Sequence, residues 1–183
     1  MIKNFLRLIL FLVLIINFKS TSMAQDQPDS LSKQYRDWVY RCVNVNKENQ
    51  CEIVQTLTIN KTNIQFTFSY SNFINDENEL KETFNIITPL GINLKEKVEI
   101  KFHEGKAINL SFSKCEVFGC VISVTNNSSD DVMLNIFNQI KKSMKKSIFF
   151  ELKIDAFQKD PLVIKSSLQG FVDAYKDLSN SKS

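Results

Sequence analysis

The sequence is poor in the side chains on which most catalytic and metal sites depend. It contains one histidine, His103, among 183 residues. A catalytic triad or a histidine metal site needs further partners, so a lone histidine beside the turn sequence EGK is typical of a surface residue. No G-x-S-x-G, Walker, H-E-x-x-H or calcium-loop motif occurs, and the carboxylates, Asp37 included, follow no catalytic pattern. We therefore expect no enzymatic activity, no cofactor and no metal ion.

The chain also lacks an excess of positive charge outside its N-terminal segment. It has 23 basic and 20 acidic side chains, but three of the basic ones lie in residues 1–24, which contain no acid, and this leaves 20 of each sign. Because nucleic-acid binding depends on a net positive surface, we expect no nucleic-acid partner. The sequence KKSMKK (141–146) could bind phosphate or an anionic membrane. Cations at the end of a helix also stabilise its macrodipole, and we favour that interpretation.

A long apolar run is present at the N-terminus. Two basic residues precede the run 8–18, and Ser22 and Ala24 provide the small residues of a cleavage site. A span across a bilayer needs about 20 apolar residues, which this run does not reach. Residues 1–24 are therefore predicted to be a secretory signal peptide, with no transmembrane segment after its cleavage.

All four cysteines follow this segment, and their even number in an exported chain favours disulfide bonds. Four cysteines allow three pairings, and the sequence alone leaves them open. We favour Cys42–Cys51 and Cys115–Cys120, because both separations suit neighbouring strands joined by a turn. A zinc site is less favoured, since C-x8-C is a poor ligand spacing. A thioredoxin-like centre would need C-x-x-C at the start of a helix, whereas CEVFGC leads into a β-branched stretch.

The rest of the chain is dominated by short segments in which apolar and polar residues alternate, the pattern of half-buried strands. In DWVYRCV, for example, Trp38, Tyr40 and Cys42 share one face. Strands are expected at 37–43, 51–59, 64–70, 83–88, 97–102, 107–112, 120–124, 148–154 and 162–166. Most of the phenylalanines outside the signal alternate within such strands, which favours a place in the core over a groove for an apolar ligand.

Two segments have helical periodicity instead. The sequence SSDDVMLNIFNQIKKSMKK begins with Ser128 and Asp131 at the spacing of a capping box. Its apolar residues Met133, Phe137, Ile140 and Met144 recur every three or four positions. A second helix is expected in LQGFVDAYKDL, with Phe171, Ala174, Tyr175 and Leu178 on one side.

These elements predict one domain over residues 35–183. Residues 25–34 are interpreted as a polar lead-in, and residues 72–82 as an exposed polar loop. Because strands far outnumber helices, we predict a mainly β fold: an antiparallel β-sandwich with two helices in the C-terminal half, linked by two disulfides.

Several motifs occur in an order that resembles one family of exported bacterial proteins. YRDWVYRC is followed by QCEIVQ, then by TPLGINLKEKVEI, FSKCEVFGC and finally SLQGFVDAYKDL. Together they resemble the invasion-associated locus B (IalB) family over nearly the whole chain after the signal. Arg36 departs from the pattern, since the family often has a glycine before the aspartate–tryptophan pair.

The resemblance implies a periplasmic or envelope-associated protein with paired disulfides and no known enzymatic activity. We therefore expect a non-enzymatic protein, located in the periplasm or cell envelope or on the outer surface, that binds an envelope or host macromolecule. One alternative is a periplasmic thiol-disulfide or chaperone-like factor that uses Cys115 and Cys120. A carrier for an apolar small ligand is the other.

Overall fold

The computed structural model describes residues 30–45, 48–59, 63–75, 77–155 and 160–181. The predicted signal peptide and the first half of the predicted lead-in lie outside these ranges. In chain order the elements are β1 (Ser30–Tyr35), β2 (Trp38–Val45), β3 (Glu48–Thr58), β4 (Gln65–Ile74), β5 (Leu80–Thr88), β6 (Val98–Phe102), β7 (Ala107–Leu110), β8 (Lys114–Glu116), β9 (Gly119–Thr125), α2 (Asp131–Lys146), β10 (Phe149–Ile154), β11 (Leu162–Ser167) and α3 (Phe171–Asn180).

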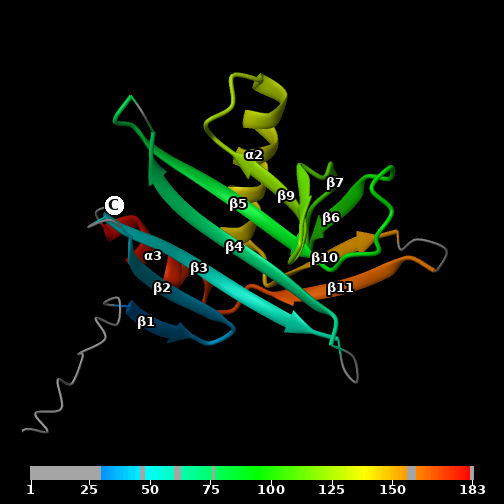
Figure 1. Cartoon of the computed structure of the whole chain (residues 1–183), viewed down its shortest axis with the longest axis horizontal. Coiled ribbons are helices and arrows are strands. Elements are labelled where there is room, and N and C mark those ends of the chain that lie inside the picture. The colour runs from blue at the N-terminus through cyan, green and yellow to red at the C-terminus, as the bar shows by residue number, and fades with distance from the viewer. Residues whose placement is uncertain (1–29, 46–47, 60–62, 76, 156–159, 182–183) are drawn as a thin grey trace, which may run out of the picture.

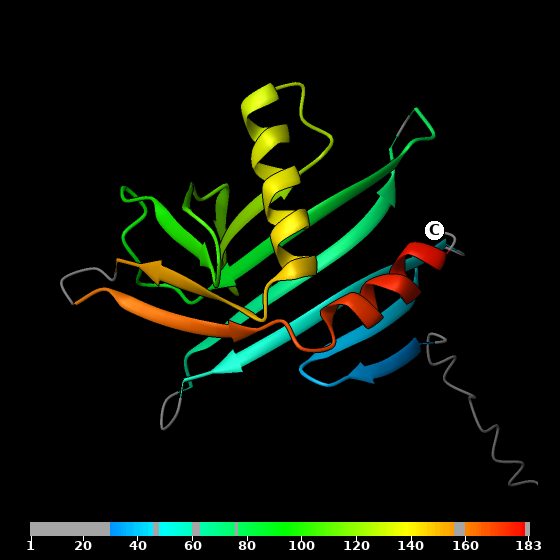
Figure 2. The ribbon, with the colours of Figure 1, turned by 180° about the vertical axis from the view of Figure 1, so that it is seen from behind.

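The strands form two antiparallel sheets (Figure 1). The larger sheet has the strand order β1-β2-β3-β4-β5-β9-β8, and the smaller sheet has the order β11-β10-β6-β7. Seen from behind, both helices and the β10–β11 hairpin lie across one face of the larger sheet (Figure 2). α3 packs on β1 to β4, whereas α2 packs on β9 and α3. The predicted mainly antiparallel β fold with two helices in the C-terminal half is confirmed.

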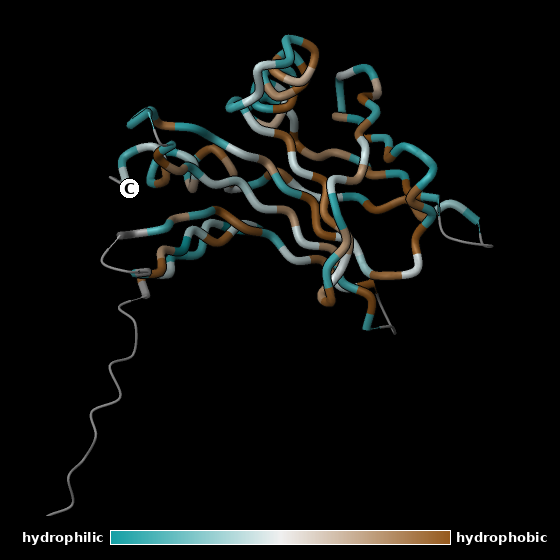
Figure 3. Tube along the Cα trace, turned by 45° about the horizontal axis from the view of Figure 1, so that its top comes forward, coloured by the Kyte–Doolittle hydropathy of each residue, from teal (hydrophilic) through white to brown (hydrophobic). Residues whose placement is uncertain are grey.

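Alternating side chains of both sheets and one side of each helix form the hydrophobic core. The rings of Phe68 on β4 and Phe150 on β10 meet edge to face, with their centres 4.9 Å apart, where the two sheets face each other. Hydrophobic positions recur along the strands (Figure 3). The fully buried phenylalanines are Phe66, Phe68, Phe84, Phe102, Phe137, Phe150 and Phe171. In the described chain, phenylalanine therefore serves mainly to fill the core.

The structure has strand residues that the sequence did not predict: β8, the first three residues of β3, and the segments described next. Residues 30–34, predicted as a lead-in, belong to β1, an edge strand that pairs antiparallel with β2. Residues 72–74 and 80–82, predicted as loop, extend β4 and β5, so that Asn72 lies opposite Glu82. Most residues of β1 are polar, and at the ends of β4 and β5 the polar pair Asn72 and Glu82 interrupts the apolar alternation by which sequence periodicity detects strands.

The start of the first described helix also differs from the prediction. α2 begins at Asp131, and its N-cap is Asp130 rather than Ser128. The Asp130 carboxylate accepts a hydrogen bond of 2.8 Å from the backbone N–H of Val132. The predicted apolar face is correct, because Phe137, Ile140 and Met144 are buried and Met133 is partly buried against the core.

A group of side chains that we call the Trp38 junction joins the beginning of the domain to its end. It consists of Trp38, Gln55, Ser166, Ser167, Gly170 and Phe171. The Trp38 indole donates a hydrogen bond of 2.9 Å to the carbonyl of Ser167. Its ring packs edge to face with the ring of Phe171, with the ring centres 5.1 Å apart. The junction therefore fixes the β11–α3 corner against β2.

Gln55 is the buried polar centre of this junction, with a side chain 5% exposed. Its amide nitrogen donates to the carbonyls of Asp37, at 3.0 Å, and Ser167, at 3.2 Å. Its amide oxygen accepts a hydrogen bond from the hydroxyl of Ser166. Because an unsatisfied buried amide is costly, these bonds specify how the C-terminal segment meets the larger sheet.

Two residues with positive φ lie on either side of the same contact. Gly170 has φ +90°, and a Cβ atom on it would lie 1.9 Å from the carbonyl oxygen of Tyr35. Arg36, in the turn between β1 and β2, has φ 51°. The left-handed region favours glycine, the residue that the pattern this chain resembles often has at this position.

Substituting these two positions in opposite directions should give opposite effects on the free energy of unfolding. Arg36→Gly relieves the backbone and loses one exposed hydrogen bond to Gln169, so we expect a change between zero and about 1 kcal/mol of stabilisation. Gly170→Ala adds both strain and a clash, so we expect more than about 2 kcal/mol of destabilisation. Urea unfolding with the disulfides intact measures both changes, and equal effects would contradict this account.

Candidate functional site

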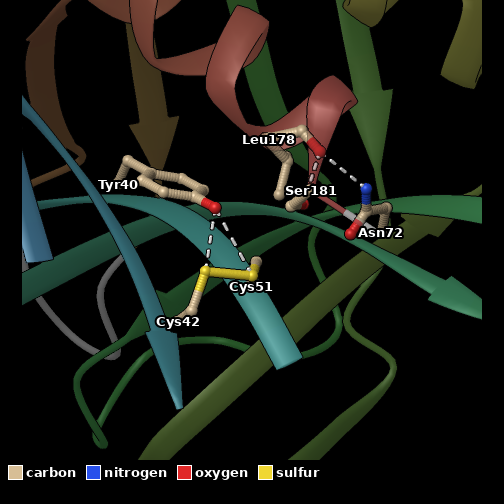
Figure 4. The surroundings of a disulfide bond; sticks show 6 residues. All are labelled: Tyr40, Cys42, Cys51, Asn72, Leu178 and Ser181. Atoms are coloured by element: carbon tan, nitrogen blue, oxygen red, sulfur yellow. Dashed lines mark hydrogen bonds between the residues drawn. A yellow bond between two sulfur atoms is a disulfide. The ribbon is translucent and has the colours of Figure 1, made fainter. Parts of the chain in front are cut away.

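The first cysteine pair is buried under a tyrosine (Figure 4). Cys42 on β2 and Cys51 on β3 are directly opposed and form a disulfide. The Tyr40 hydroxyl lies 2.9 Å from the Cys42 sulfur and 3.6 Å from the Cys51 sulfur. Disulfide sulfurs carry no hydrogen, so the hydroxyl is the donor in both contacts. The pair is shielded from solvent and belongs to the core.

The C-terminal end of α3 is held beside this disulfide (Figure 4). Asn72, in the segment predicted as loop, donates a hydrogen bond of 3.0 Å from its amide to the carbonyl of Leu178. The Ser181 hydroxyl donates to the same carbonyl at 2.7 Å. Carbonyls of the last helical turn lack partners within the helix, so these two donors end α3 against β4.

The second cysteine pair has a different environment. Cys115 on β8 and Cys120 on β9 are directly opposed and form a disulfide next to a tight turn. Cys115 is exposed, whereas Cys120 is 3% exposed. The turn residues Val117 and Phe118 are 95% and 64% exposed. This hairpin therefore presents apolar side chains to solvent from a cross-linked base.

A polar cluster joins both helices to the larger sheet, and we call it the Glu82 cluster: Glu82 of β5, Lys141 and Lys145 of α2, and Tyr175 of α3. The Tyr175 hydroxyl donates a hydrogen bond of 2.7 Å to the Glu82 carboxylate. Lys141 forms an ion pair with the same carboxylate. The Lys145 ammonium lies 3.6 Å from the centre of the Tyr175 ring, within the range of a cation–π contact.

Glu82, Lys141 and Tyr175 of the cluster keep fixed protonation states at neutral pH, whereas burial and the charge of Lys141 lower the pKa of Lys145. Burial raises the pKa of Glu82, but hydrogen bonds from Lys141 and Tyr175 and the charge of Lys141 outweigh it and hold the pKa below its usual range. Burial lowers the pKa of Lys141, but the Glu82 carboxylate outweighs this and raises it. Burial and Glu82 raise the pKa of Tyr175. None of these three groups is suited to exchange protons near pH 7, so their role is to join three elements.

Tyr70 lies under this cluster and links it to the core. Its ring contacts those of Phe137, Phe171 and Tyr175, with centres between 5.6 and 6.2 Å apart. Burial and the Glu82 charge raise the pKa of Tyr70. Its hydroxyl is buried and makes no hydrogen bond to the described part of the chain.

The structure separates the other polar residues considered from the sequence. His103 is exposed in the β6–β7 turn, with its ring 4.7 Å from that of Phe149. Asp37 is exposed in the β1–β2 turn. In KKSMKK, two lysines belong to the Glu82 cluster and Lys142 and Lys146 are exposed. Among the described residues, no three His, Cys, Asp or Glu side chains converge as metal ligands.

Sequence reasoning missed the Glu82 cluster, although one signal for it exists. The alternation of β5 continues backwards from the buried Ile86 and Phe84, which places position 82 on the same face. Tyr175 also lies on the apolar side of its helix with a hydroxyl that needs a partner. The pairing itself depends on three elements far apart in the chain.

Comparison with known proteins identifies the family. A model of the invasion associated locus B (IalB) protein family matches residues 38–179. The chain belongs to this family. The crystal structure of invasion associated protein B from Bartonella henselae is similar, with a TM-score of 0.61 and 19% identity over 82% of this chain and 96% of that one. At this identity the likeness establishes a shared fold. No curated protein matches the sequence.

Three of the motifs that resemble the IalB family meet in the Trp38 junction. The aspartate–tryptophan pair supplies Trp38, the glutamine after the second cysteine is Gln55, and the Ser-Leu-x-Gly-Phe motif supplies Gly170 and Phe171. These residues close the fold.

Removing the Glu82 charge should change how stability depends on pH. The pKa of Glu82 is lower in the folded than in the unfolded chain, so its stabilisation is present well above 4.5, its ordinary value, and is lost as the pH falls below that value. Glu82→Gln should cost on the order of 1–2 kcal/mol at pH 7 and less at pH 3. Urea unfolding of both proteins at the two pH values measures this.

Asp173→Asn provides the matched control. Asp173 pairs with Lys176 at 3.1 Å on the exposed side of α3. Such exposed pairs contribute little, so we expect a change within about 0.5 kcal/mol at either pH. An equal loss in the two variants would show that the Glu82 cluster has no special structural role.

Proposed function

We propose that this IalB protein is a non-enzymatic envelope protein, exported through the signal peptide at residues 1–24, that binds another macromolecule in the periplasm or at the cell surface. The Cys42–Cys51 and Cys115–Cys120 bonds suit an exported protein, because disulfides persist in oxidising compartments. Neither described helix is long and apolar enough to cross a membrane. The name of the Bartonella relative refers to invasion, and a host macromolecule is one partner that this proposal includes.

The observation that carries the proposal is the apolar end of the β4–β5 hairpin. Ile74 and Leu80 are 44% and 52% exposed there and lie directly opposite each other on one face of the hairpin, whereas Phe73, which is 37% exposed, belongs to the opposite face. Both views show this end projecting from the body of the molecule (Figures 1 and 2). Adjacent exposed apolar side chains on a paired strand are typical of an interaction surface.

The projecting end has a fixed base. The next pair toward the body of the sheet on the same face consists of Asn72 and Glu82. Asn72 forms a hydrogen bond with α3, and Glu82 contacts both α2 and α3. A surface held in one conformation loses little entropy on binding, which favours affinity for a partner.

A photo-crosslinking side chain at position 80 tests this surface in cells of the bacterium. We expect a discrete higher-mass adduct from Leu80 and a much weaker one when Ile74 is also replaced by serine. The control places the crosslinker at Val163, which is 63% exposed on β11. The same adducts from both positions, or none from Leu80, would refute binding at this end of the hairpin.

The exposure of Cys115 favours one second candidate, thiol-disulfide exchange. A partner thiolate attacking the Cys115 sulfur would expel Cys120 as a thiolate, and a second thiol would resolve the mixed disulfide. Cys120 is 3% exposed, so its charged form would be generated in a buried site that disfavours it. A structural role for this disulfide is therefore the better supported interpretation.

Stepwise reduction distinguishes the two roles of Cys115–Cys120. We expect a glutathione buffer to leave both disulfides intact, because structural disulfides resist that couple. A stronger dithiol should open Cys115–Cys120 before the shielded Cys42–Cys51. Alkylation followed by mass spectrometry gives the order, and rapid opening of Cys115–Cys120 by glutathione in the folded protein would favour the exchange function instead.

A further inference from the structure

The larger sheet carries a group of short polar side chains on the face that points away from the helices. Side chains alternate along a strand, so this face holds the residues between those of the core. Ser69 of β4 lies opposite Asn85 of β5, which lies opposite Ser123 of β9. Ser71 and Thr83 form the next pair on the same face. We call these five residues the Ser69 patch, and no described helix or strand lies over it (Figures 1 and 2).

The patch contains hydrogen-bonding groups that the protein leaves unused. Ser69 is 6% exposed, yet its hydroxyl forms no hydrogen bond within the described part of the chain. The same holds for the Ser71 hydroxyl and for the amide nitrogen of Asn85, whose oxygen accepts a long hydrogen bond of 3.5 Å from Thr83. A nearly buried polar group without a partner is costly, so a ligand that supplies the missing bonds gains free energy here.

The charged side chains at the border of the patch are paired with each other. Glu52 lies directly opposite Ser71, and its carboxylate accepts a hydrogen bond of 2.8 Å from Arg41. On β5, Lys81 pairs with Glu79 at 2.6 Å. The neutral hydroxyls and amide are therefore the groups that remain available to a ligand. A matching ligand is uncharged and rich in groups that both donate and accept hydrogen bonds.

One aromatic ring lies on the same face at the end of the patch. Phe73 is 37% exposed and follows Ser71 by two residues along β4. Two residues of a strand span about 6.8 Å, and neighbouring strands lie about 4.8 Å apart. Both spacings are close to the size of one hexose ring. Successive sugar units can therefore bind the hydroxyls and amide of the patch while the apolar C–H face of another lies on the Phe73 ring.

The arrangement also differs from that of a protein interface. Such interfaces place large apolar or aromatic side chains at their centre and polar ones at the rim. Here the centre consists of hydroxyls and an amide, and the aromatic ring lies at one end. We propose that the Ser69 patch binds a neutral oligosaccharide or polysaccharide chain. The proposal adds a second binding surface, separate from the β4–β5 end, and a chemical class for its ligand.

An array of neutral and acidic oligosaccharides, probed with the purified protein with both disulfides intact, tests the proposal. We expect binding to neutral oligosaccharides that persists in roughly 0.5 M salt, which screens charge interactions. Replacing two unused groups, Ser71→Ala with Asn85→Ala, should lower the affinity for the best neutral ligand about tenfold or more, measured by calorimetry. Phe73→Ala should lower it about threefold or more.

Asn109→Ala is the matched control, since Asn109 is an exposed asparagine on β7 of the smaller sheet. It should bind like the unaltered protein, and unchanged thermal unfolding verifies that each variant is folded. The proposal fails if no neutral oligosaccharide on the array binds, or if the double variant binds as well as the unaltered protein. Binding confined to acidic sugars and abolished by salt would also overturn it, because the exposed lysines of α2 would then be responsible.

A further variant separates this surface from the β4–β5 end. Leu80→Ser lies on the other face of the sheet and should leave sugar binding unchanged. Loss of sugar binding in this variant, but not in the double variant, would place the ligand at the β4–β5 end and refute the Ser69 patch. Failure of sugar binding leaves the crosslinking result at Leu80 unaffected, because the two proposals involve different residues.

Discussion

The fold depends on the contact between the end of the domain and its first long strands in the Trp38 junction. β11 and α3 cover Trp38 and bury Phe171, so apolar burial provides the driving force for closing the structure. Burial alone does not specify which residues meet. Gln55 does so, because its buried amide finds three partners only when β11 reaches the correct register. Gly170 completes the contact by allowing two backbones to approach more closely than any other residue would permit.

Much of the sheet structure follows from the sequence because side chains on a strand alternate between two faces. β2, β4 and the centre of β5 each carry large apolar residues on every second position, and these are the positions that the structure buries. Side-chain alternation does not predict β1, because Tyr35 is its one side chain that packs on the core. Its formation depends on backbone pairing with β2, which has no side-chain pattern. The limits of β4 and β5 are missed because their inner faces become polar where the helices supply hydrogen-bond partners.

The candidate sites divide in the same way. Counting cysteines in a chain with a signal-like N-terminus indicates disulfides, and the antiparallel hairpins then place the local pairs directly opposite each other. The Glu82 cluster combines one residue from a strand with three from two helices, and no local spacing expresses that arrangement. Arg36 shows a further limit of prediction from sequence. Its positive φ could be suspected only because arginine stands where the family pattern often has glycine. Tertiary contact decides such positions, and local propensity does not.

The two projecting hairpins show how the internal polar contacts serve the exposed surface. An apolar side chain in water is useful for binding only if the backbone that carries it keeps one shape, since ordering a loop on contact would offset the gain. The β4–β5 end is anchored by Asn72 and Glu82, which connect it to α3 and α2. The β8–β9 tip is anchored by Cys115–Cys120 and by the close contact of Gly119 with Thr88. The backbone of each hairpin is therefore kept in one conformation by different chemistry. At the β4–β5 end an ion pair does so, because the helices supply the partners. At the β8–β9 tip a covalent bond does so, because β8 is an edge strand with a neighbouring strand on one side only.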